Sequence, residues 1–152
     1  PEEGIMPKLV KAAKWTYGWV VVGPNREIAM PPPAWCEFRL RAGETAIFTP
    51  GSRTSGGFGV STPALLAEAG RRTDPVRLRE LGRCPFGIGR VSVPQQIPLE
   101  QGALLLAVRG SVRALAFVAQ GPIYDEALRH PELAVFYPRS GAAEPDEKPG
   151  AT

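Results

Sequence analysis

The sequence contains an internal repeat, and this repeat limits the folds that the chain can adopt. Shifting the chain by 59 residues aligns two segments without a gap. The shift superimposes five identical residue pairs: Gly43 on Gly102, Gly51 on Gly110, Ser52 on Ser111, Phe58 on Phe117, and Pro63 on Pro122. In each copy, two apolar stretches flank a Gly-Ser turn, and the second stretch is centred on the shared Phe. Each copy is therefore predicted to form a β-hairpin.

A short helix is expected after each hairpin. Both hairpins are followed by a proline, Pro63 or Pro122, and proline suits the first turn of a helix. Upstream, the match continues with a shift of 63 residues, which aligns "EIAMP" (27–31) with "RVSVP" (90–94). Both segments alternate apolar and polar residues and stop at a proline, as a short half-buried strand does.

The remaining segments add further short elements. The runs "WVVV" (19–22) and "ELAVFYP" (132–138) indicate strands. The runs "PPPAWCEFRL" (31–40) and "DPVRLRELG" (74–82) indicate short helices, the second ending at Gly82. Seventeen Gly and seventeen Pro separate the apolar runs, which is typical of many short strands joined by turns. The predicted fold class is mainly β with short helices.

The length and composition predict one domain. A chain of 152 residues with 43% hydrophobic content can bury a core of its own. We expect a single pseudo-symmetric domain over residues 1–139, with repeat one at about 15–70 and repeat two at about 82–138. The tail over residues 140–152, "SGAAEPDEKPGAT", has little to bury and is expected to be disordered.

The second copy carries a motif. The segment "GRVSVPQQIPLEQGALLLAV" (89–108) resembles the AbrB/MazE/SpoVT family of swapped-hairpin proteins. That family has a Gly-Arg pair, a short apolar strand ending at Pro, a turn ending near Gly, and an apolar strand. The matching positions are Gly89, Arg90, Val91, Val93, Pro94 and Gly102. The first copy matches at Ile28, Met30, Pro31 and Gly43, whereas Arg26 and Glu27 stand where the family has Gly and Arg.

The resemblance implies an architecture and a partner. In this family, two chains interleave their hairpins into one small swapped-hairpin β-barrel, and the dimer grips DNA through basic residues near the Gly-Arg turn. Two copies in one chain imply an intramolecular pseudo-dimer, because half of such a barrel cannot bury its apolar face alone. A homodimer of two such pseudo-dimers is also compatible with the pattern.

The first functional hypothesis is a DNA-binding transcriptional regulator or an antitoxin-like protein. The candidate phosphate contacts are basic residues at the matching motif, near the N-terminus and in the arginine-rich segment 71–90. They are Lys8, Lys11, Lys14, Arg26, Arg83 and Arg90. Glu27 opposes this hypothesis because a carboxylate repels phosphate, and a net charge of +3 is low for a tight DNA binder. An ordinary surface-turn role for Arg90 is the structural alternative.

The second hypothesis is a binding or assembly module that recognises a small anion or a protein partner. Where the second hairpin has "VRALAFV", the first has "RTSGGFGV", which exchanges side chains for glycines, hydroxyls and an arginine. Exposed backbone amides beside an arginine suit a phosphate or carboxylate. The candidate residues are Ser52, Arg53, Thr54, Ser55, Gly56 and Gly57. The structural alternative is a wide, glycine-containing hairpin turn.

An enzyme is the third hypothesis and has little support. The single histidine, His130, follows a predicted helix, where it is expected to cap carbonyl groups. Cys36 and Cys84 form no CxxC pair and predict two reduced, partly buried thiols. We expect no structural metal and no cofactor. The apolar runs are shorter than the roughly 18 residues of a membrane helix, so we expect a soluble cytoplasmic protein with no membrane contact.

Overall fold

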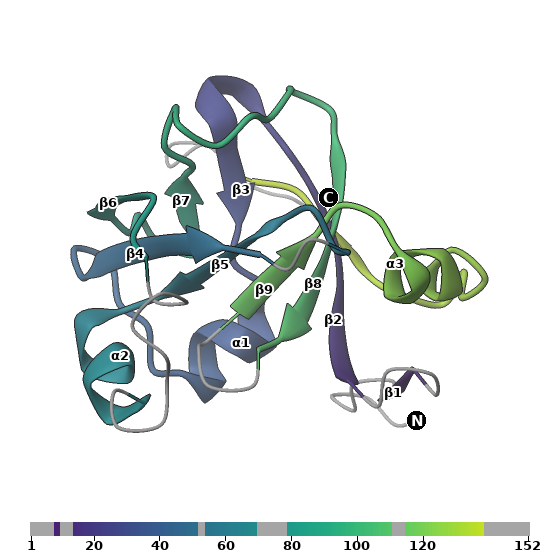
Figure 1. Cartoon of the computed structure of the whole chain (residues 1–152), viewed down its shortest axis with the longest axis horizontal. Helices are drawn as coiled ribbons and strands as arrows, with labels where there is room; N and C mark the ends of the chain where they lie inside the picture. The colour runs from purple at the N-terminus through teal and green to yellow at the C-terminus, as the bar shows by residue number, and fades with distance from the viewer. Residues whose placement is uncertain (1–7, 10–13, 52–53, 70–78, 111–114, 139–152) are drawn as a thin grey trace.

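The computed structural model describes residues 8–9, 14–51, 54–69, 79–110 and 115–138. The described chain is mainly β with a few short helices, as predicted (Figure 1). The strands are β1 (Lys8–Leu9), β2 (Lys14–Val21), β3 (Glu27–Ala29), β4 (Thr45–Pro50), β5 (Phe58–Ser61), β6 (Gly82–Pro85), β7 (Arg90–Ser92), β8 (Leu104–Arg109), β9 (Leu115–Val118) and β10 (Val135–Phe136). The helices are α1 (Pro32–Glu37), α2 (Pro63–Ala69), α3 (Pro122–Ala127) and the 3-10 turn η1 (Pro24–Arg26).

Both hairpins and the helices that follow them lie where the repeat predicts them. Strands β4 and β5 form the first hairpin, and β8 and β9 form the second. The predicted helix over residues 74–82 differs, because Gly82 begins β6 and residues 79–81 are not helical. The remainder of that segment, and the predicted disordered tail over 140–152, lie outside the described residues.

The main sheet is mixed and open. Its strand order is β1-β2-β8-β9-β5-β4-β6, and β10 adds to β2 as a parallel neighbour. The predicted β-barrel is therefore wrong as a closed structure among the described strands. Strands β3 and β7 form a separate two-stranded ladder, and each ends shortly before a proline, Pro31 or Pro94. Among the described residues, this ladder has no backbone pairing with either edge of the main sheet, so it does not close the sheet.

The hydrophobic core fills one face of the main sheet. Phe48, Phe58 and Phe117 are fully buried there, and the rings of Phe58 and Phe117 stack with their centroids 5.2 Å apart. Helix α1 covers part of this core, since the Trp35 ring meets Phe86 edge to face. Aromatic side chains therefore tie the two hairpins to each other and to α1.

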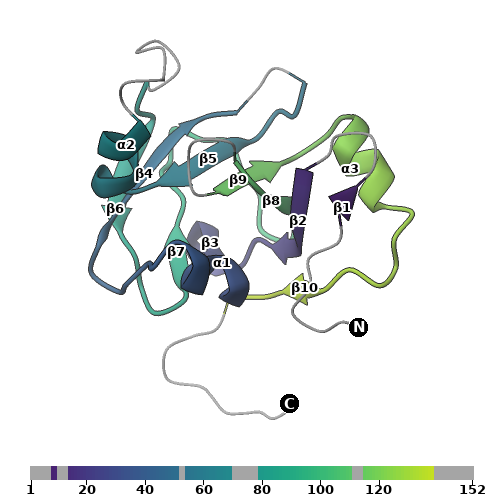
Figure 2. The same cartoon turned by 90° about the horizontal axis from the view of Figure 1, so that it is seen from below.

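A smaller apolar cluster lies under α3. Trp19 of β2 and Tyr124 of α3 make an edge-to-face contact at 5.0 Å, and Leu106 and Val108 of β8 pack beside them. Helix α2 lies at the opposite end of the sheet, as Figures 1 and 2 show. The two hairpin-plus-helix units thus extend in different directions from the pairing of β5 with β9.

Residues that the repeat makes equivalent meet on neighbouring strands. The shift of 63 matches Ile28 with Val91, and these residues pair directly across β3 and β7. The shift of 59 matches Phe58 with Phe117, and these residues pair directly across β5 and β9.

The turns repeat their hydrogen bonds as well. The Gly43 N–H donates to the Phe86 carbonyl at 2.9 Å, and the Gly102 N–H donates to the Val22 carbonyl at 2.7 Å. Two further backbone hydrogen bonds are equivalent to each other under the shift of 63. The Met30 N–H donates to the Gly89 carbonyl at 2.8 Å, and the Val93 N–H donates to the Arg26 carbonyl at 2.9 Å. The two copies therefore make equivalent backbone hydrogen bonds, and their elements follow in the same order.

Candidate functional site

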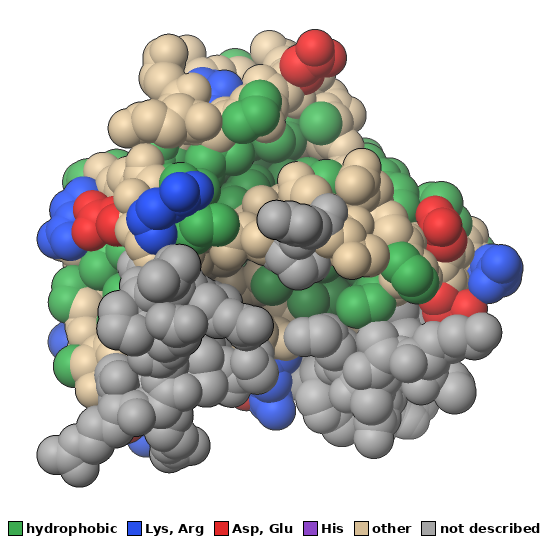
Figure 3. Space-filling model, in the orientation of Figure 1, with side chains coloured by type: hydrophobic (Ala, Val, Ile, Leu, Met, Phe, Trp, Pro, Cys, Tyr) green, Lys and Arg blue, Asp and Glu red, His purple; other side chains and the backbone are tan. Residues whose placement is uncertain are grey.

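The described residues enclose a half-open cavity of about 280 Å³ between two loops. One wall comes from the described ends of the β4–β5 loop, at Gly51, Gly56 and Gly57, and the other is the segment 96–99 that follows β7. The lining residues are Pro50, Gly51, Gly56, Gly57, Phe58, Leu81, Gln96, Ile97, Pro98, Leu99, Leu105 and Ala119. In Figure 3, hydrophobic side chains gather below the uppermost loop, and most charged side chains lie toward the margins of the molecule. Both repeats contribute to this cavity.

The packing and the backbone conformation of the β4–β5 loop require glycine at several of its positions. The Gly51 N–H donates to the Gly57 carbonyl at 3.2 Å, which closes the base of the loop. A Cβ on Gly57 would lie 1.6 Å from the carbonyl oxygen of Phe117, so a side chain there would separate β5 from β9. Gly56 has a φ of +63° and lies against the side chain of Gln120. Gly57 therefore permits the close approach of β5 to β9, and Gly56 provides a left-handed backbone conformation in the loop.

The rest of the predicted anion loop is only partly described. Thr54 is exposed, and the Ser55 carbonyl accepts hydrogen bonds from the N–H groups of Ala119 and Gln120 at 2.8 and 3.0 Å. Ser52 and Arg53 lie outside the described residues. What the structure adds to this loop is the neighbouring cavity, which Gly56 and Gly57 help to line.

Arg26 holds the second wall in place. Its Nε donates to the Val93 carbonyl at 3.0 Å, and its two terminal nitrogens donate to the carbonyls of Pro94 (2.6 Å), Leu99 (3.3 Å) and Ile97. One guanidinium thus satisfies four carbonyl groups of a segment without regular secondary structure. This side chain, predicted to contact DNA, is used inside the protein.

Gly82 assists Arg26 in shaping this wall. A Cβ on Gly82 would lie 2.8 Å from a ring carbon of Pro94, so the segment that follows β7 passes directly over the glycine. A larger residue at this position would force Pro94 or the backbone at residue 82 to shift.

The other two predicted arginine contacts are paired with carboxylates. Arg90 meets Glu27 at 2.8 Å, and Arg83 meets Glu80 through two hydrogen bonds of 2.6 and 2.7 Å. The Arg83 guanidinium holds the pKa of the Glu80 carboxyl below its usual range. The structure does not bring Arg26, Arg83 and Arg90 together as a free basic surface.

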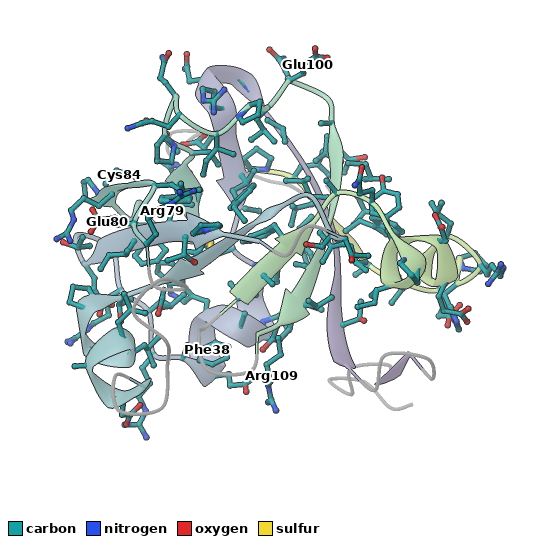
Figure 4. All side chains as sticks on the ribbon, viewed as in Figure 1. Phe38, Arg79, Glu80, Cys84, Glu100 and Arg109 are labelled. Atoms are coloured by element: carbon teal, nitrogen blue, oxygen red, sulfur yellow. The ribbon has the colours of Figure 1, made fainter. Side chains whose placement is uncertain are left out.

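The predicted lysine contacts are placed only by their backbone. Lys8 lies in β1 and Lys14 in β2, which pair with each other, and Lys11 lies outside the described residues. Arg79 of the arginine-rich segment, and Arg39 and Arg41 outside it, are exposed and form no ion pair with another described residue. Figure 4 shows Arg79 beside Glu80 and Cys84 near β6.

A second polar cluster joins β2, α1 and β8. The Tyr17 hydroxyl donates to Glu37 at 2.8 Å, and Arg109 bonds the other oxygen of the same carboxylate. Burial and the hydrogen bond to Glu37 raise the pKa of Tyr17 well above its usual range. Figure 4 shows Arg109 near Phe38, the residue that follows α1. This cluster fixes α1 to the sheet through the Glu37–Arg109 ion pair, while the buried Nε of Arg109 has no hydrogen-bond partner among the described residues.

The remaining reactive residues do not converge. Cys36 is exposed, Cys84 is half-buried, and both are free thiols. Burial raises the pKa of Cys84, although its hydrogen bond to the Ser92 carbonyl acts in the opposite direction. In the described part of the chain, no three His, Cys, Asp or Glu residues are grouped as a metal site would require. Of the helices described, none combines the length and apolar character needed to cross a lipid bilayer.

Comparison with known proteins gives no relative for this chain. No family model, no curated protein and no solved structure matches it. The candidate site therefore depends on geometry alone, and sequence reasoning missed the wall formed by Leu81, Leu105 and the segment 96–99. One signal was present: Arg26 replaces the glycine that the repeat places at residue 89.

Proposed function

We propose that this chain is a non-enzymatic binding module whose ligand occupies the cavity between the β4–β5 loop and the segment 96–99. The observation that supports this proposal is the construction of the cavity wall. Arg26 contributes four hydrogen bonds to hold that segment above an apolar recess. Apolar recesses formed by fixed walls are the usual setting of small-molecule binding.

We also propose that the scaffold is a swapped-hairpin pair of repeats of the AbrB-like kind. In support, strand β2 of the first repeat pairs with β8 of the second, and β6 of the second pairs with β4 of the first. The direct pairings of Ile28 with Val91 and of Phe58 with Phe117 are those expected beside a two-fold axis between equivalent copies. The scaffold would then explain why both repeats line one cavity.

The binding proposal is tested by closing the cavity from its rim. Ala119 is exposed and lines the cavity, so Ala119→Trp should fill it without disturbing the core. A fragment library is screened against the full chain by amide chemical-shift mapping. We expect shifts clustered at Gly51, Gly56, Leu99 and Ala119 in the wild type, and their loss in Ala119→Trp.

The matched control is Ala42→Trp, which adds an indole at an exposed turn whose residue does not line the cavity. This variant should retain the wild-type shifts. Fragments that perturb other surfaces only, or that bind Ala119→Trp as well as the wild type, would contradict the proposal.

DNA-binding transcriptional regulation, of a regulator or antitoxin-like kind, is a second proposal. Its support is the AbrB-like motif at residues 89–108 together with the exposed Arg39, Arg41 and Arg79, which form no ion pair within the described ranges. Fluorescence anisotropy with mixed-sequence duplexes at low salt is the test, because non-specific phosphate contacts are strongest there. Arg79→Ala should weaken binding and reduce the salt slope by roughly one. Absence of any binding at low salt would refute this proposal.

A further inference from the structure

We draw no further inference here: the strongest candidate, the exposed apolar surface of Leu104, Val135 and Tyr137 at the end of the main sheet where β8, β2 and β10 lie side by side, carries no proposal because nothing in the structure shows what covers it.

Discussion

Replacing Arg26 by methionine tests whether one guanidinium holds the cavity wall. Methionine keeps an unbranched apolar stem but removes the hydrogen bonds to the carbonyls of Val93, Pro94, Ile97 and Leu99. A hydrogen bond from a charged donor contributes about 1.5–3 kcal/mol. Four bonds from one half-buried group do not add, and the freed carbonyls gain access to water. We therefore expect Arg26→Met to lower the free energy of unfolding by about 2–4 kcal/mol.

Two further substitutions separate the hydrogen bonds from the backbone strain. Arg26 has a φ of +60°, a left-handed conformation that favours glycine, and its equivalent Gly89 has a φ of +68°. Arg26→Gly should therefore be less destabilising than Arg26→Met by about 1 kcal/mol. Arg26→Lys should give an intermediate loss, because an ammonium group keeps the charge but cannot span four carbonyls.

The assay is urea unfolding followed by tryptophan fluorescence, with slopes compared between variants. Arg129→Met is the control, since Arg129 forms an exposed ion pair with Glu126 and its loss should cost less than about 1 kcal/mol. The fragment-induced shifts at Gly51, Gly56, Leu99 and Ala119 should also weaken in Arg26→Met under conditions where the variant is folded. An Arg26→Met variant within about 0.5 kcal/mol of the wild type would refute the assigned role.

Three other residues or pairs give independent checks. Gly57→Ala should destabilise the protein by more than about 2 kcal/mol, because its methyl group would overlap the Phe117 carbonyl. Urea unfolding measures this loss, and a variant as stable as the wild type would contradict the assigned contact. Cys36 should react with a disulfide reagent faster than Cys84, since Cys36 is exposed and burial raises the pKa of Cys84; equal rates of labelling in single-cysteine variants would contradict this. Hydrogen bonds to Glu132 and Glu126 raise the pKa of His130, so its stabilising contribution is complete below the unfolded pKa of about 6.5 and is lost as the pH rises through the folded value. His130 is the single histidine, so one proton resonance reports this pKa, which Glu132→Gln should lower; an unshifted wild-type resonance would argue against the contact.

Local patterns were sufficient to locate most elements. The prolines at 63 and 122 and the apolar runs around Phe58 and Phe117 predicted the helices and hairpins because these signals act within a few residues. The closed barrel failed because closure depends on pairing between strands distant in sequence. Strands β3 and β7 pair only with each other, and no local pattern shows that they do not pair with the edges of the main sheet.

Sequence patterns drew attention to the β4–β5 loop but did not predict the cavity beside it. Glycines and hydroxyls in the β4–β5 loop suggested an anion site, yet Gly57 is required by its contact with β9. The opposite wall comes from residues 96–99, about forty positions later, and its position depends on the long reach of Arg26. A contact between positions so far apart in the sequence leaves no periodic signal.

The opposite charges at positions 27 and 90 link the proposed architecture to the choice of site. These positions are equivalent under the shift of 63, so a two-fold relation between the copies would bring them near one axis. In a homodimer of a single-copy protein, both would carry the same residue, and like charges there would repel. A fused repeat can place Glu27 against Arg90 at 2.8 Å and convert that repulsion into an ion pair. Glu27 thus pairs with the arginine that the family resemblance assigns to DNA, which counts against Arg90 as a phosphate contact in this chain.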